Sequence, residues 1–157
     1  MNQQVVSLEA ESAGAEESHR QYVVFSLKDE NYGIEISSVK EIVKWTTITK
    51  LPDMAPEMAG MIKLREEVIP VISLHRRFGL AEPENKESTK IVILETGGKT
   101  IGINVDDVEE VVNVTKTHKR SGEFTDGSNW TKGIAKLEDY LLILLDVRSL
   151  FSNGIDV

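Results

Sequence analysis

The sequence predicts an all-β protein built from two small five-stranded β-barrels. Short runs of β-branched and aromatic residues alternate with turn residues along the chain, and the pattern of the first half recurs in the second. An amphipathic helix of about 12 residues or more is not visible in the sequence. Because a five-stranded unit of this size exposes two sheet edges, closure into a barrel is the usual way to hide them.

The first half of the chain contains five predicted strands. A break at Asp29–Asn31 separates a β-branched, aromatic run from an alternating run, which is the pattern of a hairpin. A second hairpin is predicted to turn at Arg65–Glu67. The five predicted strands span residues 21–27, 32–36, 42–45, 61–64 and 68–73.

Short helical turns are predicted between and after these strands. Ser38, followed three residues later by Glu41, fits a capping box and predicts a helical turn before the third strand. Another turn is expected at 56–59, and residues 74–78 form a short predicted helix. The polar segment 79–88 is predicted to be a loop.

The second half has the same predicted organisation, with five strands and a final helical turn. Its predicted strands span residues 90–94, 100–105, 111–115, 131–136 and 141–146, and the helical turn covers 147–151.

An internal repeat is the strongest signal in the sequence. The segment Gly33–Val43 aligns with Gly102–Val112, 69 residues later, and Gly60–Leu64 aligns with Gly133–Leu137, 73 residues later. Chance similarity among strands rich in Val and Ile does not preserve the order of four elements together with matching Gly, Glu and Lys residues. We therefore infer a duplication. The identical positions in the first pair of segments are Gly33, Ile34, Val39, Glu41 and Val43.

Composition divides the chain into a tail and a body. Residues 1–19 contain four Glu and no Lys or Arg, together with mostly small and polar residues, and are expected to form a disordered acidic tail. The body, 20–153, is expected to consist of repeat units near 20–88 and 89–153. Whether a terminal strand exchanges between these units is left open.

Charge and residue types exclude several classes of function. The chain has no cysteine, which excludes disulfides, Cys-ligated zinc, iron–sulfur clusters and thiol catalysis. Its net charge of −8 argues against non-specific binding of nucleic acid. The N-terminus lacks the pattern of a secretion signal, and the longest apolar run, 140–145, is too short to insert into a membrane. A cytoplasmic location is expected.

Catalytic motifs do not assemble in the sequence. Residues 97–100 resemble the end of a phosphate-binding loop, but Ile93 stands where that pattern requires Gly. The acidic cluster around Asp106 and Asp107 falls on a predicted helical turn, where capping and solvent exposure explain it. The histidines His19, His75 and His118 lack metal-ligand spacing. No cofactor, no metal and no enzymatic activity are expected, and a small hydrolase is the weakest alternative.

A binding module remains, and the exposed loops supply candidate anchors. Arg65 lies at a predicted hairpin tip, while Arg120 and Phe124 lie in the polar loop 116–129. Packing of Phe124 onto its own barrel, and plain solvent exposure of Arg65, are the alternatives.

The body resembles the bacterial chemotaxis coupling protein family CheW. The resemblance rests on an ordered set of segments: Tyr22–Phe25, Tyr32–Ile34, Val39–Ile42, Gly60–Arg65, Val68–Ile72 and Arg77–Gly79. It implies two SH3-like barrels and an adaptor that joins the cytoplasmic tips of chemoreceptors to the regulatory domain of the histidine kinase CheA. It also implies ring or array assembly and membrane association through receptors, with a monomer in isolation. The open alternative is a coupling module of another chemosensory-type kinase pathway, such as one for pili or biofilms.

The resemblance also implies particular contact residues. The receptor-binding positions match Val39, Glu41, Gly60 and Arg65. The kinase-binding positions match Ile42, Lys44, Thr46, Arg120, Glu123 and Phe124.

Four positions depart from the family pattern, and the first is Lys63, which stands where the family usually has Asn. Glu66 stands where the family usually has Gly, which implies a positive φ that costs a non-Gly residue on the order of 1 kcal/mol. Ser73 replaces a usual Asp, and His75 lies where Arg is usual.

Overall fold

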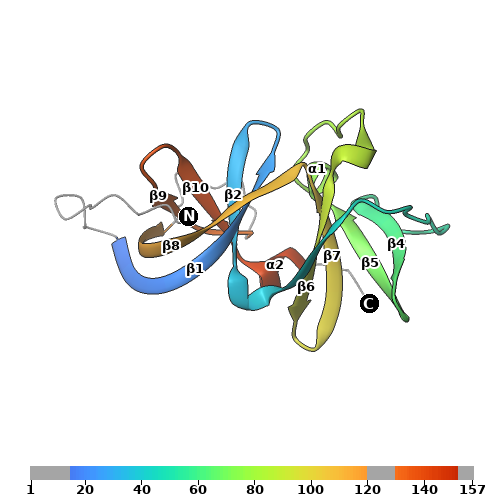
Figure 1. Cartoon of the computed structure of the whole chain (residues 1–157), viewed down its shortest axis with the longest axis horizontal. Helices are drawn as coiled ribbons and strands as arrows, with labels where there is room; N and C mark the ends of the chain where they lie inside the picture. Colours follow the sequence, from blue (N-terminus) through green and yellow to red (C-terminus); the bar gives the residue numbers. More distant parts are fainter. Residues whose placement is uncertain (1–14, 120–129, 152–157) are drawn as a thin grey trace.

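A computed structural model describes residues 15–119 and 130–151 of the chain. Five of its strands form a closed barrel, in which each strand is hydrogen-bonded to the next in the order β1–β2–β10–β9–β8. Figure 1 shows this barrel on the left. Its strands are β1 (Ala15–Leu27), β2 (Glu30–Glu35), β8 (Asp107–Lys119), β9 (Thr131–Lys136) and β10 (Leu141–Leu145).

The other five strands form a second sheet, in the order β3–β6–β7–β5–β4. Its edge strands β3 and β4 do not pair directly; one isolated bridge joins Thr49, in the segment after β3, to Met61 on β4. The fold class is confirmed as two five-stranded β-sheets, although only the first closes as a barrel. The strands of the second sheet are β3 (Val39–Lys44), β4 (Met58–Leu64), β5 (Glu67–Ser73), β6 (Lys90–Thr96) and β7 (Lys99–Val105).

The two sheets do not coincide with the two repeats. The barrel takes β1 and β2 from the first repeat and β8, β9 and β10 from the second. The second sheet takes β3, β4 and β5 from the first repeat and β6 and β7 from the second. The repeats therefore exchange a whole hairpin rather than one terminal strand. The exchange creates two parallel pairings, β2 with β10 and β5 with β7.

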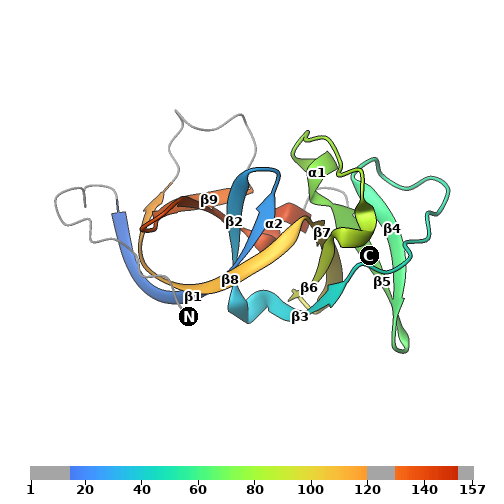
Figure 2. The ribbon, with the colours of Figure 1, turned by 45° about the horizontal axis from the view of Figure 1, so that its top comes forward.

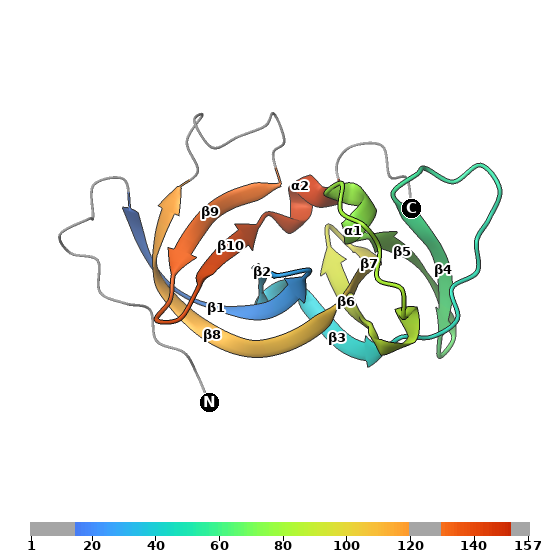
Figure 3. The same ribbon diagram turned by 90° about the horizontal axis from the view of Figure 1, so that it is seen from above.

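A shared hydrophobic core joins the two sheets. The largest buried cluster contains Phe25 and Ile34 from the barrel together with Ile72 and Ile103 from the second sheet. Two short helices, α1 (Leu74–Arg77) and α2 (Val147–Phe151), lie near this junction, as Figures 2 and 3 show. Leu74 and Leu150 insert from these helices into the same cluster. The sheets are therefore held together by apolar burial as well as by the chain that crosses between them.

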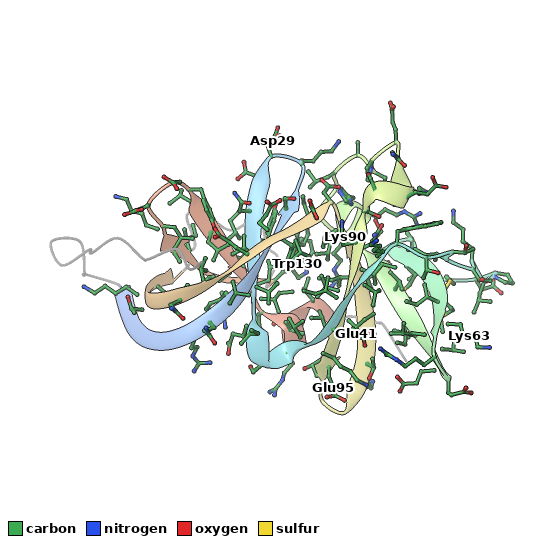
Figure 4. All side chains as sticks on the ribbon, in the orientation of Figure 1. Asp29, Glu41, Lys63, Lys90, Glu95 and Trp130 are labelled. Carbon is green, nitrogen blue, oxygen red and sulfur yellow. The ribbon has the colours of Figure 1, made fainter. Side chains whose placement is uncertain are left out.

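Three aromatic side chains, called here the aromatic wedge, pack together at the junction of the two sheets. Phe78, which follows α1, stacks between Tyr32 of the barrel and Trp130, with ring centroids 5.4 and 4.9 Å apart. The guanidinium of Arg77 lies 5.2 Å from the centre of the Trp130 ring and pairs with Glu57 at 3.0 Å. Figure 4 labels Trp130 near the middle of the molecule.

Most predicted elements occur, but the predicted capping box does not. Ser38 ends the short 3₁₀ helix η2 (Ile36–Ser38), and its expected partner Glu41 lies in β3 instead. The helical turn expected at 56–59 is also wrong, because β4 begins at Met58. A further 3₁₀ helix, η3 (Lys86–Ser88), lies in the segment predicted to be a loop.

The first strand begins earlier than the predicted body. β1 starts at Ala15, so residues 15–19, which we expected in the acidic tail, belong to this strand, and residues 15–17 pair with β8. Residues 1–14 lie outside the described residues. The limits of the tail and of the repeat units remain predictions.

Candidate protein-binding surface

β3 carries several of the predicted contact residues on an alternating strand. Val39, at its start, is half-buried and packs against the shared core. Ile42 and Lys44 lie two residues apart on the exposed face, where 43% of Ile42 is accessible. Burial of the exposed part of Ile42 against a partner would be favourable.

Glu41 and Arg65 are bonded to each other. The two guanidinium Nη atoms of Arg65 donate to the two carboxylate oxygens of Glu41 at 2.9 and 2.8 Å. The pair links β3 to the tip of the β4–β5 hairpin, across the gap between the two edges of the second sheet. A weaker contact, 3.8 Å between Lys40 and Glu67, spans the same gap. Figure 4 labels Glu41 on β3 and Lys63 on the neighbouring hairpin.

The ion pair shifts the pKa of both groups. The hydrogen bond from Arg65 lowers the pKa of Glu41, and the hydrogen bond to Glu41 raises the pKa of Arg65 further. Since the pKa of Glu41 is lowered on folding, the pair stabilises the folded state at neutral pH and is lost as the pH falls through that lowered pKa. Both side chains border solvent, so salt screens the attraction.

The hairpin tip has its unusual backbone at Arg65, not at Glu66. The turn between β4 and β5 has two residues, and Arg65 has a φ of 56°, whereas Glu66 is not among the residues with positive φ. A positive φ at the first central residue is typical of a type II′ hairpin turn, which favours Gly there. The prediction of a positive φ at Glu66 is therefore wrong. The strained backbone is at Arg65, the residue that forms the ion pair.

Gly60 is buried on β4, where its lack of a side chain allows a neighbouring segment to pack closely. It has a φ of 147°, and a Cβ atom added there would lie 2.4 Å from the carbonyl oxygen of Thr49. Thr49 and Met61 exchange two backbone hydrogen bonds of 2.8 Å at this point. Gly60 therefore permits the segment after β3 to lie against β4, and a direct contact with a partner is not available to it.

The remaining predicted residues are divided between the surface and the undescribed loop. Thr46 is exposed in the segment that follows β3. Arg120, Glu123 and Phe124 lie outside the described residues.

Sequence reasoning missed several exposed apolar side chains. The two most exposed are Val68 on β5, at 64%, and Leu141 on β10, at 56%. Strand alternation carries the signal for Val68, because Ile69 and Val71 on either side of Pro70 point into the core.

Polar groups near the junction have structural partners. His75 is fully buried, with Nε2 2.9 Å from Asp106 Oδ1, and Asp106 Oδ2 accepts a 2.6 Å hydrogen bond from the Lys28 backbone N–H. Asp107 begins β8, so the helical turn expected there is wrong. The His75 imidazole is buried, while the Asp106 carboxylate is partly exposed. In the described part of the chain, no group of three or more His, Asp or Glu side chains is placed to hold a metal ion.

Two hollows lie near the junction of the sheets. One of about 660 Å³ is lined by Pro56, Glu57, Arg76, Arg77 and Trp130. The other, of about 260 Å³, is polar and includes Glu35, Lys132 and Asp146. Their charged side chains are largely paired with one another, as in the bond between Lys132 and Glu35.

Comparison with known proteins decides the family. The family model of the CheW-like domain matches residues 21–154. The chain belongs to the CheW family. It is a scaffold protein of chemotaxis, as the family is, and is non-catalytic.

The chain is similar in sequence to individual CheW proteins over most of their length. The chemotaxis protein CheW of Treponema pallidum is 34% identical over 140 residues, which cover 85% of this chain and 82% of that protein. The CheW protein of Klebsiella aerogenes is 30% identical over 152 residues, with coverages of 95% and 89%. The crystal structure of the scaffolding protein CheW from Thermoanaerobacter tengcongensis superposes with a TM-score of 0.79 at 35% identity, covering 89% of this chain and 98% of that one.

The structure shows the contacts of two positions that depart from the CheW family pattern. His75 is not a surface residue but ties α1 to the connection between β7 and β8 through Asp106. Ser73 caps α1, and its hydroxyl also donates to Glu82. No helix among the described residues is long and apolar enough to cross a membrane.

The role of Gly60 in letting the segment after β3 lie against β4 can be tested by adding a single methyl group. Gly60→Ala should lower the free energy of unfolding by on the order of 2–4 kcal/mol, because its Cβ meets backbone in a strained conformation. Gly98→Ala is the matched control, since Gly98 also has a positive φ but has no atom within 4 Å of an added Cβ. The control should cost about 1 kcal/mol. Urea unfolding of both variants measures this, and equal losses would contradict the steric role of Gly60.

Proposed function

We propose that this chemotaxis scaffold couples chemoreceptor tips to the regulatory domain of the histidine kinase CheA. The observation that supports this most is the convergence of predicted contact residues on one part of the second sheet. Glu41 and Arg65, 24 positions apart in the sequence, form a single bidentate ion pair beside the exposed face of β3. Residues predicted for two partners thus lie on the same edge strand and the hairpin bonded to it.

The proposed receptor contact consists of Val39, Glu41 and Arg65. The ion pair fixes the hairpin tip against β3, and Val39 anchors the start of the strand in the shared core. Gly60 acts on this contact indirectly, by allowing the segment after β3 to lie against β4. A receptor that docks here meets a preformed surface, which lowers the entropic cost of binding.

The proposed kinase contact is the β3 surface, formed by Ile42, Lys44 and Thr46. Ile42 supplies apolar area that a partner can bury, and Lys44 favours a partner with acidic groups. By resemblance, the loop residues Arg120, Glu123 and Phe124 contribute a second contact to a neighbouring kinase domain.

The mechanism proposed for the chain is thermodynamic linkage. An adaptor that binds one signalling state of the receptor–kinase complex more tightly than another shifts the population towards that state. We propose that the chain is monomeric in isolation, binds no nucleic acid, works in the cytoplasm and reaches the membrane only through receptor arrays. The alternative is service in a different chemosensory-type kinase pathway, which co-purification from the source cell would distinguish.

The kinase contact is tested by truncating its apolar side chain. Ile42→Ala should raise the Kd for the regulatory domain of CheA by about fivefold or more, because an interface anchor contributes about 1 kcal/mol or more. Leu141→Ala is the matched control, since Leu141 is also an exposed aliphatic side chain, 56% accessible against 43% for Ile42, but lies on the barrel. It should leave the Kd within about twofold. Titration calorimetry measures both, and equal losses, or no binding by the wild type at tens of micromolar, would count against the proposal.

The receptor contact is tested by reversing the charge of Arg65. Arg65→Glu removes the bond to Glu41 and places a third carboxylate beside Glu66 and Glu67, so receptor capture should weaken about tenfold or more. The pair is exposed, so the fold should persist. Pull-down with a receptor tip fragment and circular dichroism measure the two effects. If the circular dichroism changes as much as capture does, Arg65 acts through the fold rather than through a contact.

A further inference from the structure

Neither repeat of this chain has a hydrophobic core of its own. Each of the three buried clusters draws side chains from both repeats. The shared core joins Phe25 to Ile103, the barrel core joins Tyr22 to Val112, and the core of the second sheet joins Ile62 to Ile93. A chain that contained one repeat alone would lack part of every cluster and would expose its own share of apolar side chains to water, which is unfavourable by about 25 cal/mol for each Å² of apolar surface.

Strand pairing gives the same result. Within the first repeat, the continuous ladders join β1 to β2 and β4 to β5, while β3 pairs with β6 of the second repeat. The first repeat alone is therefore two separate hairpins, and an isolated hairpin is marginally stable at best in water. Four ladders cross between the repeats: β1–β8, β2–β10, β3–β6 and β5–β7.

The contacts between the repeats are reciprocal, as in a two-fold symmetric dimer. Gly102 of the second repeat lies opposite Val71 of the first, and its counterpart Gly33 of the first repeat lies opposite Leu144 of the second. Both glycines allow close packing of the other repeat: a Cβ on Gly33 would lie 3.0 Å from the side chain of Leu142. Reciprocal contact between matching patches is the mark of an isologous interface.

Equivalent hydrogen bonds extend this symmetry to the helices. The Ser73 backbone N–H donates to the Glu57 carbonyl at 2.9 Å, and 73 residues later the Asp146 N–H donates to the Trp130 carbonyl at 2.6 Å. Ser73 and Asp146 also accept hydrogen bonds at the first turns of α1 and α2. These bonds lie within each repeat, so the two repeats hold their short helices in matching positions.

We infer that the two repeats recognise each other as a strand-exchanged internal dimer, held by non-covalent contacts and not by the segment that connects them. The inter-repeat surface is an interaction surface whose partner is the complementary repeat, from the same chain or from a second copy. Leu80 and Glu82 pack with the first repeat, and the exposed part of the connection around Glu84 and Asn85 raises the local concentration of one repeat near the other. This inference is independent of the proposed function, because it concerns no receptor or kinase contact.

Cleavage of the folded full-length protein tests the inference. A protease site inserted between Glu84 and Asn85, both exposed, allows the connection to be cut after folding. The cut chain should elute as one species of unchanged mass under native conditions and separate into two pieces in urea. On dilution from urea it should recover the native spectrum, with an unfolding midpoint that rises with protein concentration. The uncut protein with the same insertion is the control, and its midpoint should not depend on concentration.

A second variant addresses the interface itself. Gly33→Val drives a branched side chain into Leu142 of the other repeat and should weaken reassembly of the cut chain about tenfold or more. The inference is overturned if the cut halves separate in native buffer, if either half unfolds cooperatively on its own, or if the mixture does not recover its native spectrum. It is also overturned if Gly33→Val leaves reassembly unchanged.

Discussion

The structure depends on the burial of one apolar core that neither repeat can complete alone. Phe25 and Ile34 enter this core from the barrel, and Ile72 and Ile103 enter it from the second sheet. Because two small sheets share it, their relative position is fixed by packing rather than by a flexible linker. The helices α1 and α2 and the aromatic wedge around Phe78 close the junction. A rigid frame of this kind suits a protein that acts by holding partners in a defined arrangement.

The exchange of hairpins also leaves the second sheet with two edges that meet only at one bridge. The ion pair between Glu41 and Arg65 spans the rest of that gap with side chains. The chain thus places its predicted contact residues where backbone pairing is weakest and where side chains, not a continuous ladder, define the surface. An edge strand with exposed Ile42 would be a liability in an isolated protein, but is useful to a scaffold.

The sequence predicted local features well and long-range ones poorly. Period-two alternation and turn residues located the strands, and the recurrence of the Gly33 segment near Gly102 revealed the duplication, because both signals are local. The hairpin exchange was not predicted, since pairing between distant strands leaves no local mark. The capping box failed because the Glu41 carboxylate is bonded to Arg65 instead of to a helix start. Positive φ was assigned to Glu66 because the turn type, which places it at Arg65, cannot be deduced from composition.

The central claim is that the exposed face of β3 and the adjoining hairpin tip form the coupling surface. Crosslinking of the chain assembled with receptor tips and kinase, followed by mass spectrometry, tests it most directly. Lys44 should crosslink to the regulatory domain of the kinase, and Lys63, next to the hairpin tip, to the receptor. Lys99, at the start of β7, should give few crosslinks to either partner. Crosslinks concentrated at Lys99, with Lys44 and Lys63 free of partner peptides, would contradict the account.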